Sequence, residues 1–309
     1  MKHRLALCTV HKDEESYLPE WICYHLNVGV EHFYIYDNNS AAPTAEALRP
    51  FIDRGLVTVT PIAAFPSLLL SYNDCLARFG PSCRWIGFCD CDEFFVPKRD
   101  RHGACHWLPQ ILEDYEAHGG LVVNWMEFGS SGLLTRPEGL QLEAFRRCRI
   151  SDVVKTIAQP ARISEALQSH FMGYRAPHHA VNEHHEACPA GRNPPWPGGV
   201  QPPWVDENVR RMMNKAQLNH YFLRSRAEYE QKMLRGAHDG GRIDNPLRIA
   251  WWEESEKLYT ETDDAIVRHA GATRELMEHV LRGAASDPPL LGDLARREPH
   301  IGWRLATTD

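Results

Sequence analysis

The chain has 309 residues, with 34 Lys and Arg against 41 Asp and Glu, which gives a formal net charge of −7. Both signs are spread along the chain, which argues against a nucleic-acid-binding protein, and no apolar run reaches the length of a membrane span. The apolar stretch at the N-terminus is too short for a signal peptide, so we expect a cytoplasmic protein. The nine cysteines lack Cys-x-x-Cys spacing, and we expect them to be reduced and buried.

Strands and helices are predicted to alternate through residues 1–97. Apolar or β-branched runs that fit buried strands lie at 5–10, 33–36, 56–60 and 85–95. Apolar residues at helical spacing predict a helix in each of the intervals between these strands. This pattern predicts an α/β fold with a mostly parallel central sheet and helices on both faces. In such sheets, ligands bind beyond the carboxyl ends of the strands.

The alternation weakens after residue 97. Further strands are predicted at 121–125, 145–163 and 215–223. A helix should begin at Ser225, because Ser225 and Glu228 form a capping box. Residues 170–204 hold many histidines and then many prolines, which predicts a long loop. The remaining helical patterns, at 246–259, 263–269 and 274–282, predict a C-terminal helical extension.

The strand predicted at 85–95 runs into a cluster of acids that contains Asp90 and Asp92. Side chains alternate along a strand, so Asp90 and Asp92 are expected to point the same way. Two such carboxylates repel each other unless a cation lies between them, and oxygen ligands suit Mg²⁺ or Mn²⁺ better than zinc. The alternative is a pair of solvated turn acids. Apolar and aromatic neighbours, which make unpaired charge costly, favour the metal site.

Several motifs follow one another between residues 5 and 240. They are Lys12-Asp13-Glu14, Leu18-Pro19-Glu20-Trp21, Tyr34-Ile35-Tyr36-Asp37-Asn38-Asn39-Ser40, Asp90-x-Asp92-Glu93-Phe94, Trp125-x-x-Phe128-Gly129-Ser130-Ser131-Gly132, and Asn219-His220-Tyr221 with Ser225, Tyr229, Lys232 and Arg235. This set resembles the family 92 glycosyltransferases and related family-2-like enzymes. The resemblance implies a GT-A fold with a glycosyltransferase domain over 1–240, divided into a nucleotide-sugar-binding half (1–97) and an acceptor-binding half (98–240). Residues 241–309 would form the helical extension.

The resemblance also implies an activity and its residues. The enzyme would move a hexose from a nucleotide sugar, such as UDP-galactose, to a hydroxyl of a glycan or lipid-linked saccharide, with inversion. By the matching motifs, Asp90, Asp92 and His220 would hold Mn²⁺ or Mg²⁺. Six further motif residues would bind the donor, and they are Lys12, Glu14, Asp37, Asn38, Lys232 and Arg235. Asn73, on the helix before the acidic pair, would contact the donor as well.

Attack by an acceptor hydroxyl also needs a general base, and a positioned carboxylate is a common choice. Glu127 is the first candidate for this base and Glu143 is the second. Either residue could equally be an acid on the protein surface with no role in catalysis.

Two other functions fit parts of the sequence. A zinc-dependent hydrolase or a structural zinc module could use the histidines at 178, 179, 184 and 185 with Cys188 or Cys91, although their spacing matches no familiar zinc pattern. The second alternative is a catalytically inactive GT-A protein that only binds a nucleotide sugar. The intact Asp90, Asp92 and Glu93 argue against this alternative.

The C-terminal tail suggests one further contact. Three arginines and Trp303 lie between residues 296 and 304, and they could bring the protein to the anionic inner face of a membrane.

Overall fold

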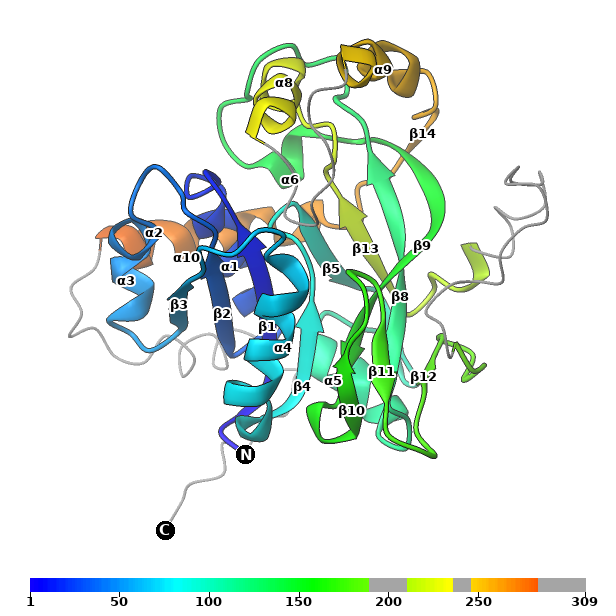
Figure 1. The fold of residues 1–309 in the computed structure, drawn as a ribbon. Coiled ribbons are helices and arrows are strands. Elements are labelled where there is room, and N and C mark those ends of the chain that lie inside the picture. The colour runs from blue at the N-terminus through cyan, green and yellow to red at the C-terminus, as the bar shows by residue number, and fades with distance from the viewer. Residues whose placement is uncertain (189–209, 236–245, 283–309) are drawn as a thin grey trace.

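The computed structural model describes residues 1–188, 210–235 and 246–282 (Figure 1). A mixed sheet runs through these residues, with the strand order β3-β2-β1-β4-β9-β8-β13-β5, and β12 and β14 pair with β8 and β9 outside this path. The strands of this path are β1 (His3–His11), β2 (His32–Asp37), β3 (Val57–Pro61), β4 (Cys83–Phe88), β5 (Glu93–Pro97), β8 (Gly120–Phe128), β9 (Arg147–Ala158) and β13 (Ala216–His220). The smaller strands are β6 (Arg99–Asp100), β7 (Gly103–Ala104), β10 (Ile163–Ala166), β11 (Met172–Tyr174), β12 (Ala180–Val181) and β14 (Glu261–Thr262).

Helices cover both faces of the sheet (Figure 1). In the first half they are α1 (Leu18–Asn27), α2 (Thr44–Ala47), α3 (Arg49–Ile52) and α4 (Leu68–Phe79). The second half adds α5 (Leu108–Leu112), α6 (Gln141–Ala144), α8 (Arg226–Arg235), α9 (Pro246–Glu256) and α10 (Ala270–Arg282).

The parallel part of the sheet is β3-β2-β1-β4. Alternation along β1 divides its side chains between two cores. Leu5 and Leu7 pack in the core that contains Trp21 of α1, whereas Ala6 and Cys8 pack with residues of α4. The predicted α/β fold of the GT-A type, with helices on both faces of the sheet, is therefore confirmed.

Strand β13 lies between β8 and the last strand of the order, β5. It runs parallel to β8 and antiparallel to β5, so that His220 pairs with Glu127 on one side and with Glu93 on the other. Strands β8 and β9 form the antiparallel part beside it. The three strands predicted after residue 97 are thus confirmed, and the structure shows that the last of them is inserted between two earlier ones.

The strand predicted over 85–95 is wrong as a single element. Strand β4 ends at Phe88 and β5 begins at Glu93, with a turn between them. The amide N–H of Glu93 donates to the carbonyl of Asp90 at 3.0 Å, and the amide N–H of Asp90 donates to Glu93 Oε2 at 2.7 Å. Because the acids lie in this turn, strand alternation does not set their directions.

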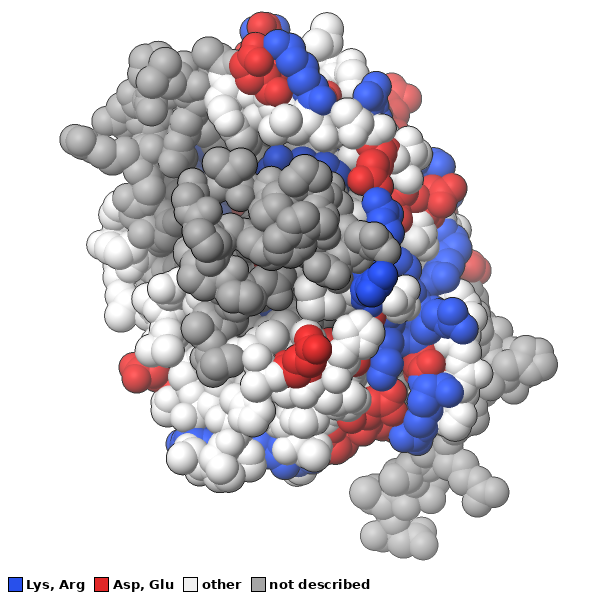
Figure 2. Space-filling model, turned by 90° about the vertical axis from the view of Figure 1, so that its right-hand side faces the viewer, with Lys and Arg blue, Asp and Glu red and all other residues white. Residues whose placement is uncertain are grey.

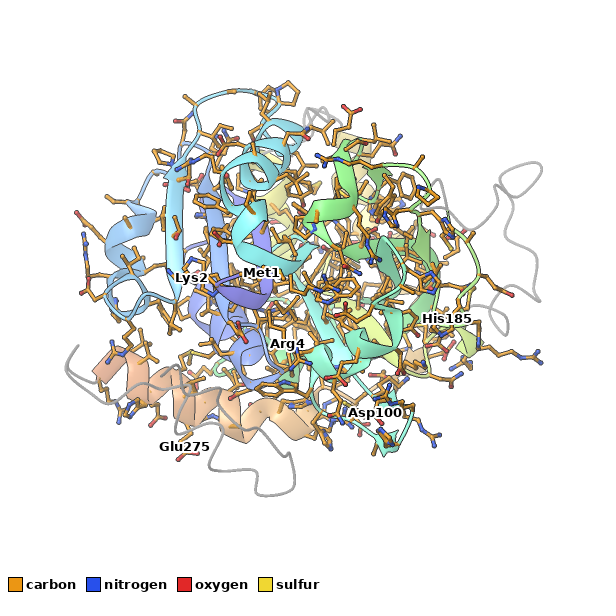
Figure 3. All side chains as sticks on the ribbon, turned by 90° about the horizontal axis from the view of Figure 1, so that it is seen from below. Met1, Lys2, Arg4, Asp100, His185 and Glu275 are labelled. Carbon is orange, nitrogen blue, oxygen red and sulfur yellow. The ribbon has the colours of Figure 1, made fainter. Side chains whose placement is uncertain are left out.

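The described part of the C-terminal extension contains the expected helices, α9 and α10, and also the short strand β14, which pairs with β9 of the main sheet. Helix α10 packs against α1, and Asn27 Nδ2 donates to Thr273 Oγ1 at 3.3 Å. Figure 3 shows α10, with Glu275 labelled, alongside the N-terminal elements. The proline-rich residues from 189 to 204 and the tail from 286 onwards lie outside the described residues.

Three other expectations concern composition. All nine cysteines are free and buried, which confirms their predicted state. Within the described ranges, no helix combines the length and the hydropathy that crossing a bilayer requires. Figure 2 shows Lys and Arg interspersed with Asp and Glu on the face that it presents.

The loop from Gly129 to Gly132 does not leave room for a ligand beside its first glycine. A Cβ on Gly129 would lie 2.7 Å from the ring of Tyr259 and 2.9 Å from Glu256 Oε1. Glu256 Oε1 also accepts a hydrogen bond from the amide N–H of Ser130. The small residue is needed because the C-terminal extension packs directly on this loop.

We predict that Gly129→Ala lowers the free energy of unfolding by about 1–3 kcal/mol, because the added methyl overpacks the contact with Tyr259. The matched control is Gly271→Ala on α10, where an added Cβ meets nothing within 4 Å. That control should leave stability unchanged or raise it by up to ~1 kcal/mol. Urea unfolding of both variants at neutral pH measures the difference, and equal stabilities would contradict the proposed packing.

Candidate active site

Acidic and amide side chains lie at the carboxyl ends of the parallel strands. Strands β1 and β2 end side by side, with His11 paired to Asp37, and the amide N–H of Asn38 donates to the carbonyl of His11 at 2.9 Å. The turn after β4 begins beside β1, where the amide N–H of Cys89 donates to the carbonyl of Cys8. The parallel sheet therefore brings residues 11–14, 37–39 and the turn at 90–93 to one edge, the carboxyl edge at which the sequence predicts ligand binding.

Asp92 is buried between two residues of the C-terminal half. Its Oδ2 lies 2.5 Å from Lys232 Nζ on α8, and its Oδ1 lies 3.7 Å from His220 Nε2 on β13. Burial raises the pKa of Asp92, but Lys232 and then His220 outweigh it and hold the pKa well below its usual value. The carboxylate is therefore ionised at neutral pH.

Asp90 has a different cationic partner. Its Oδ2 lies 3.1 Å from Lys155 Nζ, which also lies 3.3 Å from Glu93 Oε2. The Lys155 side chain is only 1% exposed. One ammonium thus serves two carboxylates. Burial raises the pKa of Glu93 to about 7, although Lys155 opposes that shift.

The fit of a divalent metal rests on Asp92 and His220. Ligand atoms at about 2.1 Å from one octahedral ion are about 3–4 Å apart, so the 3.7 Å between Asp92 Oδ1 and His220 Nε2 is compatible with a shared ion. Among the described residues, no group of three or more His, Cys, Asp or Glu side chains is arranged to hold a metal. The structure brings two of the three predicted ligands together and pairs Asp90 with Lys155, so coordination by all three stays a prediction.

Lys232, the partner of Asp92, lines a cleft of about 190 Å³. The cleft is lined by Asp13, Glu14, Tyr17, Phe222, Leu223, Arg224, Glu228, Gln231, Lys232 and Arg235. Glu14 lies between two guanidinium groups, 3.2 Å from Arg224 Nη1 and 3.2 Å from Arg235 Nη1. The cleft therefore lies between the loop after β1 and helix α8, together with the residues that directly precede this helix.

Some N–H donors of the guanidinium groups in this cleft are not used in hydrogen bonds within the described residues. Arg224 Nε and Nη2 and Arg235 Nε are buried and have no hydrogen-bond partner among the described residues. The Arg224 guanidinium also stacks on the ring of Tyr17, with its Cζ 3.6 Å from the ring centre. Fixed guanidinium donors suit the oxygens of a phosphate or carboxylate ligand.

Sequence reasoning missed Arg224, Lys155 and Tyr17. Arg224 lies three residues after the Asn219-His220-Tyr221 motif. Its backbone is left-handed, with φ of 47°, and no local sequence pattern predicts this conformation. Lys155 could have been found, because a lysine between Val154 and Thr156 in a predicted buried strand needs an anionic partner.

Three predicted donor-binding residues make hydrogen bonds to other parts of the fold. Asp37 Oδ1 accepts a hydrogen bond from the amide N–H of Ser40 at 2.9 Å, and Asn38 Nδ2 donates to the carbonyls of Ile62 and Ala64. Asn73 on α4 exchanges hydrogen bonds with the backbone of Ala166. Lys12, half-buried, lies in the loop after β1. Direct contacts of these residues with a donor stay predictions.

The two candidate bases lie in different places. Glu127 pairs in register with His220 and forms an ion pair with Arg149, with 2.5 Å between Oε2 and Nη2. Glu143 lies on α6 and is paired with Arg274 of α10. The geometry places Glu127 on the strand beside the candidate metal ligand, so it favours Glu127 over Glu143.

The histidines of the loop after β11 contact each other and other side chains. His185 Nδ1 lies 3.1 Å from His118 Nε2, and the His185 ring stacks on Tyr115. His184 Nε2 lies 3.2 Å from the carbonyl of Arg211. His185 is exposed at the periphery of the molecule (Figure 3). These contacts give the histidines a structural role in the described loop.

A GT-A-type sheet with an acidic turn at its carboxyl edge is the architecture of a glycosyltransferase. The sequence model of glycosyltransferase family 92 matches residues 3–213, and the chain belongs to this family, as its motifs predict. The match ends before β13 and α8, so His220, Arg224 and Lys232 lie beyond it.

Curated relatives agree with this family. A glycosyltransferase family 92 protein of Ricinus communis is 29% identical over 188 residues, which cover 56% of this chain and 32% of the relative. The galactan beta-1,4-galactosyltransferase GALS2 of Arabidopsis thaliana is 34% identical over 124 residues, which cover 37% of this chain and 23% of the relative. The alignments thus span a third or less of these relatives' length. Among solved structures, S. aureus TarS 1–349 in complex with UDP aligns with a TM-score of 0.33 and 14% identity, over 51% of this chain and 47% of the TarS 1–349 chain.

The pH dependence of stability tests the Glu14 site. Burial raises the pKa of Glu14, but Arg235 and then Arg224 outweigh it and lower the pKa from 4.5 to about 2. The ionised carboxylate therefore stabilises the fold above pH 4.5, and this contribution is lost as the pH falls through about 2. We predict that Glu14→Gln lowers the free energy of unfolding by roughly 3 kcal/mol at neutral pH.

The difference between wild type and Glu14→Gln should shrink as the pH falls below 4.5. Urea unfolding at a series of pH values measures it. Glu165→Gln is the control, because Glu165 is exposed on β10, and it should show almost no difference at any pH. A Glu14→Gln difference that is the same at every pH would exclude the proposed charge pairing.

Proposed function

We propose that the protein is a metal-dependent, inverting glycosyltransferase that moves a hexose from a UDP-sugar, such as UDP-galactose, to a hydroxyl of a glycan or lipid-linked saccharide. The observation that carries this proposal is the buried Asp92 carboxylate, which lies between His220 and Lys232 beside a cleft lined with guanidinium groups. The names of the two related galactan galactosyltransferases favour a galactosyl donor. Family membership favours glycosyl transfer over a zinc-dependent hydrolase.

The chemistry is dominated by charge on the leaving group. Breaking the bond to a nucleoside diphosphate develops negative charge on the phosphate oxygens, and fixed positive groups stabilise that charge. A divalent metal, held by Asp92 and His220, would supply Lewis-acid stabilisation of the same oxygens. Lys232 and Arg235 line the cleft from one helix and would bind the diphosphate, while Arg224 would add a buried guanidinium.

Glu14 organises the donor side of this cleft. Its carboxylate holds the Arg224 and Arg235 guanidinium groups in place, which reduces the entropy lost when they bind an anion. The loop that carries Glu14 and Lys12 would meet the nucleoside, with Asp37 and Asn38 at the end of the neighbouring strand.

The acceptor side lies toward β8 in this proposal. Glu127 would accept the proton of the attacking hydroxyl, and Arg149 would set the direction of its carboxylate. A base placed opposite the leaving group would take the proton from the acceptor hydroxyl, whose oxygen attacks the anomeric carbon as the bond to the diphosphate breaks, and the anomeric centre is inverted. In a cytoplasmic setting, the acceptor would be a growing polysaccharide or a lipid-linked glycan.

Binding of Mn²⁺ and UDP together should raise the melting temperature. At a hundredfold excess over Kd, ligand binding stabilises the folded state by about 2.7 kcal/mol. We predict that Asp92→Asn abolishes this shift, because it removes the charged ligand of the metal. Differential scanning fluorimetry with UDP alone, Mn²⁺ alone and both together measures it.

The matched control for Asp92→Asn is Asp114→Asn. Asp114 also pairs with a lysine, 3.1 Å from Lys215 Nζ, but it does not line the cleft. This variant should keep the full shift with Mn²⁺ and UDP. A shift that survives in Asp92→Asn, or that needs no metal, would contradict the proposed metal dependence.

The two candidate bases can be separated by turnover. Glu127→Gln should reduce kcat for transfer from UDP-galactose to a β-1,4-linked galacto-oligosaccharide by about 10² to 10⁴, with little change in the KM of the donor. Glu143→Gln should change kcat by less than about threefold, because its partner Arg274 belongs to α10. The reverse pattern would transfer the role to Glu143, and no turnover in the wild type would favour a protein that only binds the donor.

A further inference from the structure

Lys232 occupies one oxygen of the carboxylate that the metal is expected to use. Its ammonium lies 2.5 Å from Asp92 Oδ2, 3.4 Å from the carbonyl oxygen of Phe222 and 4.3 Å from the centre of the Phe222 ring. An ammonium and a divalent metal are both attracted to a carboxylate. In the structure, the lysine therefore supplies the positive charge that neutralises Asp92.

The two lysines of the acidic turn differ in their freedom to move. The Lys155 side chain is 1% exposed and contacts both Asp90 and Glu93 from a central strand. The Lys232 side chain is 19% exposed, lies on α8 and lines the cleft. Its long side chain can leave Asp92 without disturbing the sheet, whereas Lys155 is enclosed.

The remaining oxygen of Asp92 faces a histidine that can bind a metal. His220 is 6% exposed, and its Nδ1 has no hydrogen-bond partner among the described residues. Its Nε2 is the nitrogen directed toward Asp92 Oδ1. The metal-binding pair is thus in place at Oδ1, while Lys232 at Oδ2 neutralises the negative charge that would attract a metal.

The net charge of the arriving ligand determines whether Lys232 leaves Asp92. Asp92 and Lys232 together are neutral, so a dication that arrives alone adds two positive charges beside an ammonium in a buried position, which is unfavourable. A sugar-linked diphosphate carries two negative charges. A dication that arrives with it adds no net charge and offers Lys232 a new anionic partner.

We propose that Lys232 competes with the divalent metal for Asp92 and that it thereby makes metal binding depend on the nucleotide diphosphate. This inference rests on the proposed function. On binding, Lys232 would move from Asp92 Oδ2 to the diphosphate, and a metal held by Asp92 Oδ1 and His220 Nε2 would replace it as the cation that neutralises Asp92. The free enzyme holds the metal weakly as a result.

Electron paramagnetic resonance of free Mn²⁺ tests this by measuring Mn²⁺ affinity with and without UDP as the probe. In wild type, UDP should tighten Mn²⁺ binding by roughly 5- to 150-fold, the usual range of coupling between two ligands. Lys232→Met should bind Mn²⁺ alone about tenfold more tightly than wild type, because the competing charge is gone. The same variant should bind UDP more weakly.

Two further variants separate competition from a general loss of positive charge. Lys232→Arg keeps a competing cation and should keep weak binding of Mn²⁺ alone. Arg235→Met removes one positive charge from the same helix, but Arg235 pairs with Glu14 rather than Asp92. It should weaken UDP binding and leave the affinity for Mn²⁺ alone near the wild-type value.

The failures of the two proposals are distinguishable. If Lys232→Met binds Mn²⁺ alone no more tightly than wild type, while UDP still tightens Mn²⁺ binding, competition at Asp92 is wrong and the metal-dependent function stands. If Mn²⁺ fails to bind wild type both with and without UDP, both proposals are wrong. If Arg235→Met tightens Mn²⁺ as much as Lys232→Met, the effect is one of overall charge and the inference is overturned.

Discussion

The buried carboxylate of Asp92 couples the fold to the site. A carboxylate removed from water without a partner would cost several kcal/mol, so its turn is stable only when a cation is close. The cation comes from α8, 140 residues later, and the backbone of the same turn accepts a hydrogen bond from the amide N–H of Tyr221 at 2.9 Å. Docking of β13 and α8 on the first half of the sheet is therefore both a folding step and the assembly of the site.

Local patterns in the sequence are sufficient to predict the first strands, the start of α8 and the edge of the sheet at which the site lies. The apolar runs of β1, β2 and β3 and the capping box at Ser225 act within a few residues, and the structure confirms them. The carboxyl edge of a parallel sheet then collects the loops after β1 and β2 without further information. These are the features that depend on propensity, alternation and connectivity.

The interactions that complete the site connect residues far apart in the chain, and no local pattern specifies them. Arg224 reaches Glu14 across 210 residues, and Lys155 reaches Asp90 across 65. The turn after Phe88 interrupts an apolar run that looks continuous, because its backbone is closed by Glu93 and not by a glycine or proline. Gly129 is small because Tyr259 packs on it, which only the tertiary structure shows.

Four of the acids that the sequence placed in the site are paired with cations, whereas Asp37 accepts a hydrogen bond from the amide N–H of Ser40. Glu14 is paired with arginines, Asp90 and Asp92 with lysines, and Glu127 with Arg149. A ligand therefore exchanges existing ion pairs and does not fill an unpaired charge, so its affinity is the difference between the contacts it makes and those it breaks. A small anion could draw Lys232 away from Asp92 but would leave that carboxylate without a cation, whereas a neutral metal–diphosphate unit would provide a cation for the carboxylate and an anion for the lysine at once. The ion pairs of the cleft thus discriminate in favour of a ligand that carries both charges.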